Sequence, residues 1–215
     1  MRVSHETIYR SRFIQARGVL KKELIQHLRC KRHSGVGGQS RGQIVDAIPI
    51  RERPTEIEDR AIPGHWEGDL LSGNKNSHIA TLLERHSRFT ALVKVPSKDT
   101  AAVVAALSRH VRKLLASLRR SLTWDRGLEM AKHKTFTVAT HVKVYFCDPH
   151  SRWQRGSNEN TNGLLRQCFP KRTDLSGYSQ SDLDKVALRL NQRPRKTLGF
   201  ETPASRLRAS VAMTH

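Results

Sequence analysis

The chain has 215 residues, and its 39 Lys and Arg outnumber its 19 Asp and Glu, so its formal net charge is +20 at pH 7. A surface this basic attracts polyanions, which makes nucleic acid the expected partner. The alternative is a basic protein that is merely soluble or that binds acidic proteins. Three widely spaced cysteines without a C-x-x-C pair favour neither a disulfide framework nor a cysteine zinc site.

The longest apolar run, AAVVAAL from Ala101, is far too short to cross a bilayer. The first residues, MRVSHETIYRSRF, lack the long apolar segment of a signal peptide. We therefore expect no membrane partner and a cytoplasmic, nucleoid-associated protein.

The chain opens with a small helical segment, predicted over residues 1–31. SHETIYRSRFIQ has Ser4 placed as an N-cap, and VLKKELIQHL sets three leucines four residues apart on one helical face. The stretch RHSGVGGQSRGQ is rich in Gly, Ser and Arg, which is typical of a linker. We expect this linker over residues 32–60, ahead of a folded body over residues 61–200.

The body begins with three short apolar runs, HWEGDLL, HIATLLE and FTALVKV, separated by polar turns, which predict an antiparallel meander. A helix is expected from about Asp99 through TAAVVAALSRHVRKLLASL, then a strand at SLTW, a helix at EMAKHKTFTVAT, a strand at VKVYFC and a helix at NENTNGLLRQCF. This order predicts an α/β fold with a mixed five-stranded sheet flanked by helices. SQSDLDKVALRLNQ predicts a further amphipathic helix, and residues 201–215 a C-terminal helix and tail.

Three acidic residues lie at the ends or edges of these elements. Asp69 is on the first strand, Asp125 ends the fourth, and Glu159 begins the helix after the fifth. Three carboxylates converging in a basic protein would repel one another unless cations shared the site. Mg²⁺ suits carboxylate oxygens, and a pair of such ions supports in-line displacement at phosphorus.

Glu67 lies two residues before Asp69, so on a strand both side chains share one face. A general-base role for Glu67 is conceivable, but we favour a salt bridge to a nearby Arg or Lys.

Several segments carry a family resemblance. They are PGHWEGDLL, SLTWDRGLEM, VYFCDPHSRWQRGSNENTNGLLRQCFPK and LNQRPRKTLGFETP, and 33 residues separate Asp125 from Glu159. Together they resemble the insertion-sequence-thirty family of bacterial transposases, which belongs to the ribonuclease-H-like transposases and integrases.

This resemblance implies a ribonuclease-H-like integrase catalytic core that cleaves DNA and transfers strands at insertion-element ends. It implies that Asp69, Asp125 and Glu159 form an Asp-Asp-Glu catalytic triad that binds two Mg²⁺ or Mn²⁺ ions. The implied partners are the terminal inverted repeats of the element, target DNA, and further copies of the chain in a homo-oligomer.

Basic residues in the last third of the chain are candidates for DNA contact. Arg166 shares a helical face with Glu159 and would suit a phosphate, although a solvated arginine is equally plausible. The other candidates, taken as a cluster, are Lys171, Arg172, Arg193, Arg195 and Lys196.

The start departs from the family pattern. SHETIYR resembles the recognition helix of a helix-turn-helix unit, but the helices expected before it are missing. We therefore expect an N-terminally truncated member with a partial helix-turn-helix remnant. The alternative function is a non-catalytic DNA-binding remnant that interferes with intact transposase, and a weaker one is a general ribonuclease-H-like nuclease.

Overall fold

The computed structural model describes residues 44–57, 60–149 and 151–212, which lie within one compact unit of residues 42–215. The helices predicted over residues 1–31 and the glycine-rich start of the predicted linker fall outside these ranges. The strands are β1 (Ile48–Pro49), β2 (His65–Ser72), β3 (His78–Glu84), β4 (Thr90–Val95), β5 (Ser121–Trp124) and β6 (Lys143–Phe146). The α-helices are α3 (Thr100–Val111), α4 (His133–Thr140), α5 (Gly156–Leu165), α6 (Gln180–Asn191) and α7 (Pro203–Ala212).

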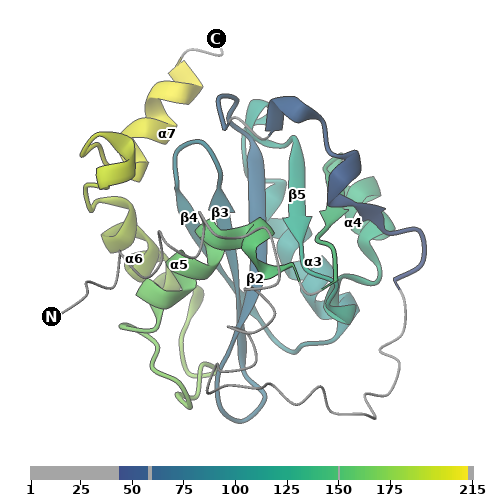
Figure 1. The fold of residues 1–215 in the computed structure, drawn as a ribbon. Coiled ribbons are helices and arrows are strands. Elements are labelled where there is room, and N and C mark those ends of the chain that lie inside the picture. The colour runs from purple at the N-terminus through teal and green to yellow at the C-terminus, as the bar shows by residue number, and fades with distance from the viewer. Residues whose placement is uncertain (1–43, 58–59, 150, 213–215) are drawn as a thin grey trace, which may run out of the picture. The chain divides into compact units, whose positions relative to one another are not determined.

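The strands form one mixed sheet in the order β1-β6-β5-β2-β3-β4 (Figure 1). Strands β2, β3 and β4 pair antiparallel, which confirms the predicted meander. Strands β1, β6, β5 and β2 pair in parallel. The predicted α/β class, with a mixed sheet flanked by helices in the manner of a ribonuclease-H-like integrase core, is confirmed.

The described part of the chain has six strands in its sheet, where the sequence predicted five. The additional strand, β1, comes from the predicted linker and pairs Ile48 with Tyr145 and Pro49 with Phe146. Two residues give no alternating pattern to detect, and proline is tolerated only at a sheet edge because it lacks an N–H donor. The strand forms because β6 offers an unpaired edge, which a local pattern does not reveal.

Three helices differ in their boundaries from prediction, and one of them, α5, ends at Leu165, four residues before the predicted end. Helix α3 ends at Val111, and the chain turns into a short 3₁₀-helix at Ala116–Leu118. This turn brings the carbonyl of Leu118 to 2.8 Å from the indole nitrogen of Trp66, which donates a hydrogen bond to it. The next predicted helix starts with a 3₁₀-turn at Leu128–Met130, and α4 itself begins at His133.

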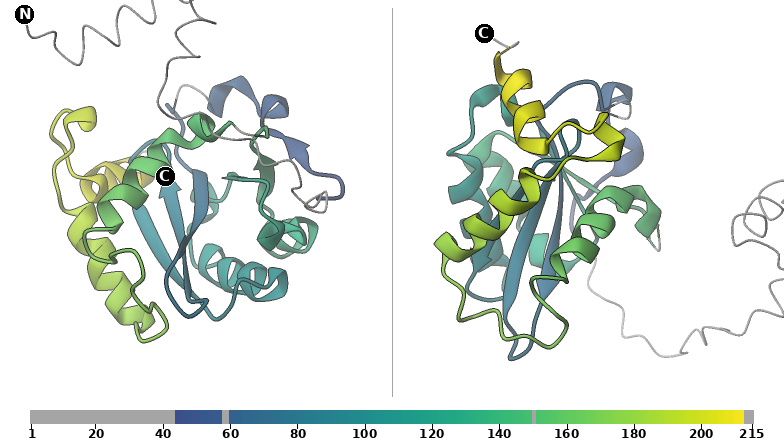
Figure 2. Two further views of the ribbon diagram at one scale, coloured as in Figure 1. Left: turned by 60° about the horizontal axis from the view of Figure 1, so that its bottom comes forward. Right: turned by 90° about the vertical axis from the view of Figure 1, so that its left-hand side faces the viewer.

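Helices cover both faces of the sheet, as the left-hand view of Figure 2 shows, with α5 and α6 on one side and α3 and α4 on the other. Alternate side chains of β3 enter different cores, because successive strand residues point to opposite faces. Ala80 and Leu82 pack in the core that includes Val103 and Phe136, from α3 and α4. Ile79 packs in the second core, beneath α5 and α6.

The outer edge of β4 is covered by two amide side chains from α6. Asn191 accepts a hydrogen bond from the Thr90 amide and donates to its carbonyl, both at 2.8 Å. Gln180 donates to the Leu92 carbonyl at 2.7 Å and accepts from the Lys94 amide at 2.9 Å. These side chains supply the bonds that another strand would make, and they block pairing of this edge with a second molecule. None of the helices described is long and apolar enough to cross a membrane.

Gly68 marks a close approach between β2 and the indole of Trp124. A Cβ atom added at Gly68 would lie 2.2 Å from Cζ3 of Trp124, which is itself fully buried. The tryptophan ring therefore rests against the β2 backbone, between Glu67 and Asp69 in the sequence.

We expect Gly68→Ala to lower the free energy of unfolding by about 1–3 kcal/mol, because a rigid buried ring cannot yield to the added methyl group. Urea denaturation measures this change. Gly163→Ala is the matched control, since nothing lies within 4 Å of an added Cβ in that position of α5. The control should stabilise the protein by up to about 1 kcal/mol through helix propensity. Equal stability of the two variants would contradict the packing argument.

Candidate active site

Two of the predicted acidic residues lie close together at neighbouring parallel strands, Asp69 on β2 and Asp125 directly after β5. The register pairs Glu67 with Thr123, so two residues further along the chain Asp69 comes level with Asp125. The guanidinium of Arg155 bridges them, with Nη1 3.5 Å from Asp69 Oδ1 and Nη2 3.5 Å from Asp125 Oδ2. Arg155 immediately precedes α5, so this bridge joins the start of the helix to the sheet.

Further hydrogen bonds orient both carboxylates. Asn162 of α5 donates to Asp69 Oδ2 at 3.0 Å, and the Leu70 amide donates to its Oδ1 at 2.9 Å. The Gly127 amide donates to Asp125 Oδ1 at 3.0 Å, in the turn that follows β5. Each carboxylate thus has a fixed direction and still has lone pairs available for a cation.

Charge and burial oppose each other at this site. Burial raises the pKa of Asp69, and the negative charge of Asp125 adds to the rise, although Arg155 acts against it. For Arg155, burial disfavours the charged form, but the carboxylates of Asp69 and Asp125 together raise its pKa. For Asp69, the effect of burial on the pKa is larger than the opposing effect of Arg155, whose Nη1 lies 3.5 Å away.

Glu159 lies in the first turn of α5 and is exposed. Its position along the helix is four residues after Arg155 and three before Asn162, the two residues that contact Asp69. Residues at this spacing share a helical face. Its side chain makes no hydrogen bond or ion pair with the described residues. Within those residues, no three His, Cys, Asp or Glu side chains lie close enough together to hold a metal ion.

Glu67 has the basic partner that the sequence analysis favoured. Its Oε1 lies 2.5 Å from Nη1 of Arg85, and both side chains are buried. Its Oε2 accepts a hydrogen bond from the backbone amide of Asn158 at 3.2 Å. The carboxamide of Asn158 in turn accepts from the hydroxyl of Thr81 at 3.3 Å. Glu67 thereby ties the first turn of α5 to the sheet, one residue before Glu159.

The predicted DNA-contact residues fall in separate places. Arg166 caps the end of α5 and donates to the Ser72 carbonyl at 3.0 Å, while Lys171 and Arg172 are exposed in the turns that follow. Arg193 and Lys196 are exposed after α6. Arg195, between them, is partly buried and lines a pocket at the other end of α5.

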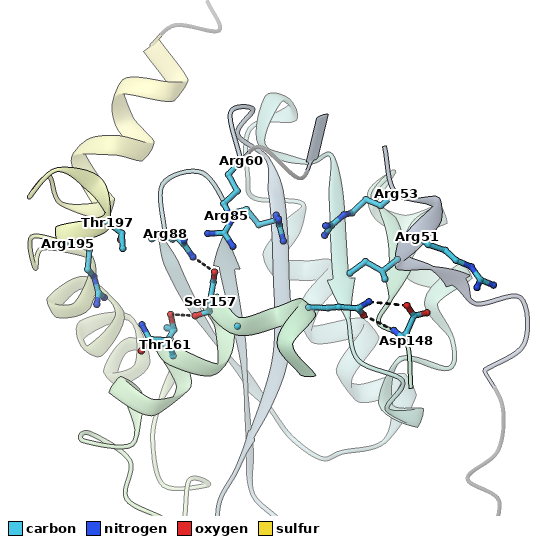
Figure 3. A pocket seen from close by; sticks show the side chains of 14 residues that line it. Arg51, Arg53, Arg60, Arg85, Arg88, Asp148, Ser157, Thr161, Arg195 and Thr197 are labelled. Carbon is cyan, nitrogen blue, oxygen red and sulfur yellow. Dashed lines mark hydrogen bonds between the residues drawn. The ribbon is translucent and has the colours of Figure 1, made fainter. Parts of the chain in front are cut away.

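This pocket has a volume of about 690 Å³ and is lined by arginines that the sequence analysis missed (Figure 3). They come from the segment after β1, the segment before β2 and the turn between β3 and β4, and with Arg195 they form the arginine pocket: Arg51, Arg53, Arg60, Arg85, Arg88 and Arg195. Residues Ser157 and Thr161 of α5 form its floor.

Sequence reasoning missed Arg155 for the same reason as the arginines of the pocket, because no single arginine stands out in so basic a chain. The local signals for the pocket were the paired arginines in RER, residues 51–53, and in RHSR, residues 85–88.

We expect Glu67→Gln to lower the free energy of unfolding by about 3–5 kcal/mol, because Arg85 is then buried without a counter-charge. The double variant with Arg85→Gln should lose less than the sum of the two single changes. Urea denaturation of all three variants measures the coupling. Lys75→Gln removes an exposed ion pair with Asp174 and should change stability by less than about 1 kcal/mol. A loss from Glu67→Gln no larger than this control would contradict the structural role.

The chain was compared with known protein families and with characterised relatives. The integrase core domain family matches residues 59–152. The chain is 52% identical, over its full length and 58% of the relative's length, to transposase InsI for insertion sequence element IS30A of Escherichia coli. It is 51% identical to the transposase for IS1086 of Cupriavidus metallidurans, over 94% of the chain and 61% of that relative.

A more distant relative is the transposase for IS4351 of Bacteroides fragilis, which is 36% identical over 97% of the chain and 65% of its own length. The chain therefore spans about 58–65% of the length of these relatives. Its match to the first two extends over nearly every residue, with an integrase core inside it. By sequence, the chain is thus similar over nearly its full length to transposases for insertion sequence elements, among them that of IS30A.

Proposed function

We propose that this chain is the catalytic part of a DNA transposase, which cleaves DNA and transfers strands at the ends of an insertion element. The observation that carries the proposal is the pair of level carboxylates, Asp69 and Asp125, joined by one guanidinium at the start of the helix that bears Glu159. The names of the relatives support it, because each is a transposase for an insertion sequence element.

The donor set fits a hard divalent cation. Asp69 and Asp125 contribute carboxylate oxygens, which Mg²⁺ and Mn²⁺ prefer, and Arg155 indicates that positive charge between them is favourable. Glu159 has no other partner among the described residues and would complete the set from α5. We propose these three as the ligands of two ions. Bound there, the ions would supply Lewis-acid stabilisation of the attacking and leaving oxygens during phosphoryl transfer.

The chain's own residues prepare this chemistry. Asn162 and the Gly127 amide hold the two aspartates in fixed directions, so little reorganisation is needed when phosphate arrives. Arg155 is buried and donates to the Gly68 carbonyl at 3.0 Å, which keeps its charge beside the reacting groups. The Glu67–Arg85 pair fixes the turn of α5 that carries Glu159.

The proposed partners are double-stranded DNA, as terminal inverted repeats and as target, and further copies of the chain. The residues proposed to contact DNA are Arg166, Lys171, Arg172, Arg193, Arg195 and Lys196. The two aspartates, Asp69 and Asp125, with their supporting hydrogen bonds, favour a catalytic protein over a non-catalytic remnant that only binds DNA.

We expect Asp69→Asn, Asp125→Asn and Glu159→Gln each to abolish cleavage of labelled element-end DNA in Mg²⁺ or Mn²⁺. Each variant should still bind that DNA, because the change removes a proposed ion ligand and adds no negative charge. Gel-resolved cleavage and fluorescence anisotropy measure the two properties. Asp184→Asn, an exposed change on α6, is the control and should cleave normally. Full cleavage by any of the three variants would remove that residue from the proposed set.

We expect Mg²⁺ to raise the melting temperature of Arg155→Gln by more than it raises that of the unaltered chain. The two carboxylates then lack their shared cation, so binding of an ion relieves a larger repulsion. Each kcal/mol of extra binding free energy corresponds to about 2–4 °C for a domain of this size. Arg126→Gln, an exposed change near the site, should behave like the unaltered chain. Equal shifts for Arg155→Gln and the control would contradict a cation site between the aspartates.

A further inference from the structure

The arginine pocket lies on the side of α5 that the acidic residues do not use. Its arginines come from residues 51–60, from residues 85–88 and from Arg195, which lie far apart in the sequence, and Figure 3 shows Arg60, Arg85 and Arg88 gathered above the first turns of α5. Of the lining residues that the structure describes, Asp148 is the one acid, and its carboxylate accepts a hydrogen bond from the side-chain amide of Gln154 at 3.0 Å. The pocket therefore concentrates positive charge.

Several observations indicate that three of these arginines, Arg85, Arg88 and Arg195, are not fully satisfied by the residues that the structure describes. Burial, followed by the positive charge of Arg60, lowers the pKa of Arg88. Burial and the charge of Arg193 lower the pKa of Arg195. The Nε atoms of Arg85 and Arg195 are buried without a hydrogen-bond acceptor among the described residues. A ligand rich in oxygen and negative charge would satisfy all of these groups together.

We propose that the arginine pocket binds consecutive phosphates of a DNA backbone, on the face of α5 opposite the acidic site. The proposal rests on the proposed transposase function, and it adds a DNA-contact surface of which only Arg195 was expected from the sequence. Guanidinium groups suit phosphate because each can donate two parallel hydrogen bonds. The pocket presents no aromatic side chain among its described lining residues, which favours backbone contact over base stacking.

The pocket is connected directly to the turn that carries Glu159. Arg88 donates to the hydroxyl of Ser157, and Arg85 binds Glu67, which accepts from the Asn158 amide. These contacts reach the two residues that precede Glu159. DNA held in the pocket would thus lie against the same helical turn that carries Glu159. The pocket would therefore determine which part of the DNA strand reaches the acidic site.

The test is Arg60→Gln combined with Arg88→Gln in the full chain, with DNA binding measured by anisotropy in EDTA across a range of salt concentrations. Loss of two phosphate contacts should reduce the slope of log affinity against log salt by about 1.8. The affinity at 0.1 M salt should fall roughly 10- to 100-fold. Arg85 is left unaltered because it neutralises Glu67.

Arg109→Gln with Arg112→Gln is the matched control. Both residues are exposed at the end of α3, on the opposite face of the sheet, and their loss lowers the net charge by the same amount. This control should retain its salt slope. Equal effects of the two double variants would overturn the pocket and leave only a general charge effect. If the unaltered chain cleaves DNA normally and the Arg60→Gln, Arg88→Gln variant binds DNA as tightly as the unaltered chain, the pocket proposal is overturned. The proposed function then still stands.

A second variant tests the pocket without removing an arginine. Thr197→Glu adds a negative charge at the exposed pocket wall after α6, and it should weaken DNA binding by a similar factor. Thr135→Glu adds the same charge on the exposed face of α4 and should have little effect. Equal binding by these two variants, each with an unchanged melting temperature, would overturn the proposal. Absence of DNA binding by the unaltered chain would overturn both the pocket and the proposed function.

Discussion

The buried ion pair between Glu67 and Arg85 is the constraint on which the site depends. Two charges taken out of water need each other, and their remaining lone pairs and N–H groups need further partners. Glu67 meets part of this need through the backbone amide of Asn158, so the strand, the turn after β3 and the first turn of α5 are fixed together. The ion pair is therefore as much a device for positioning α5 as a source of stability.

That position gives the two faces of α5 different tasks. One face carries Asn162, which with the preceding Arg155 contacts Asp69, and the other presents Ser157 and Thr161 to the arginine pocket. Negative charge is thus gathered on one side of a single helix and positive charge on the other. Because α5 lies between these aspartates and the arginine pocket, the two opposite charges are kept apart. Arg155 also neutralises part of the negative charge, so a basic protein can hold Asp69 and Asp125 close together.

Sequence reasoning predicted the α/β class, the meander and the basic partner of Glu67, because strand alternation and helix periodicity are local signals. It missed β1, which has no pattern of its own and forms only on the edge of β6. It also missed the role of Arg155 and most of the arginine pocket, since arginines from distant segments converge only in the folded chain. The triad roles of Asp69, Asp125 and Glu159 remain proposals that depend on the family resemblance.

Strand β1 also bears on where the catalytic unit begins. The sequence placed the start of the body near residue 61, and the integrase core match begins at residue 59. The structure continues the sheet back to Ile48, and the residues that follow β1 bring Arg51 and Arg53 to the pocket. A fragment that starts at either sequence-derived boundary would expose the edge of β6 and lose Arg51 and Arg53, and a start at residue 61 would also lose Arg60. The functional unit of this fold is thus longer at its N-terminal side than its recognisable domain.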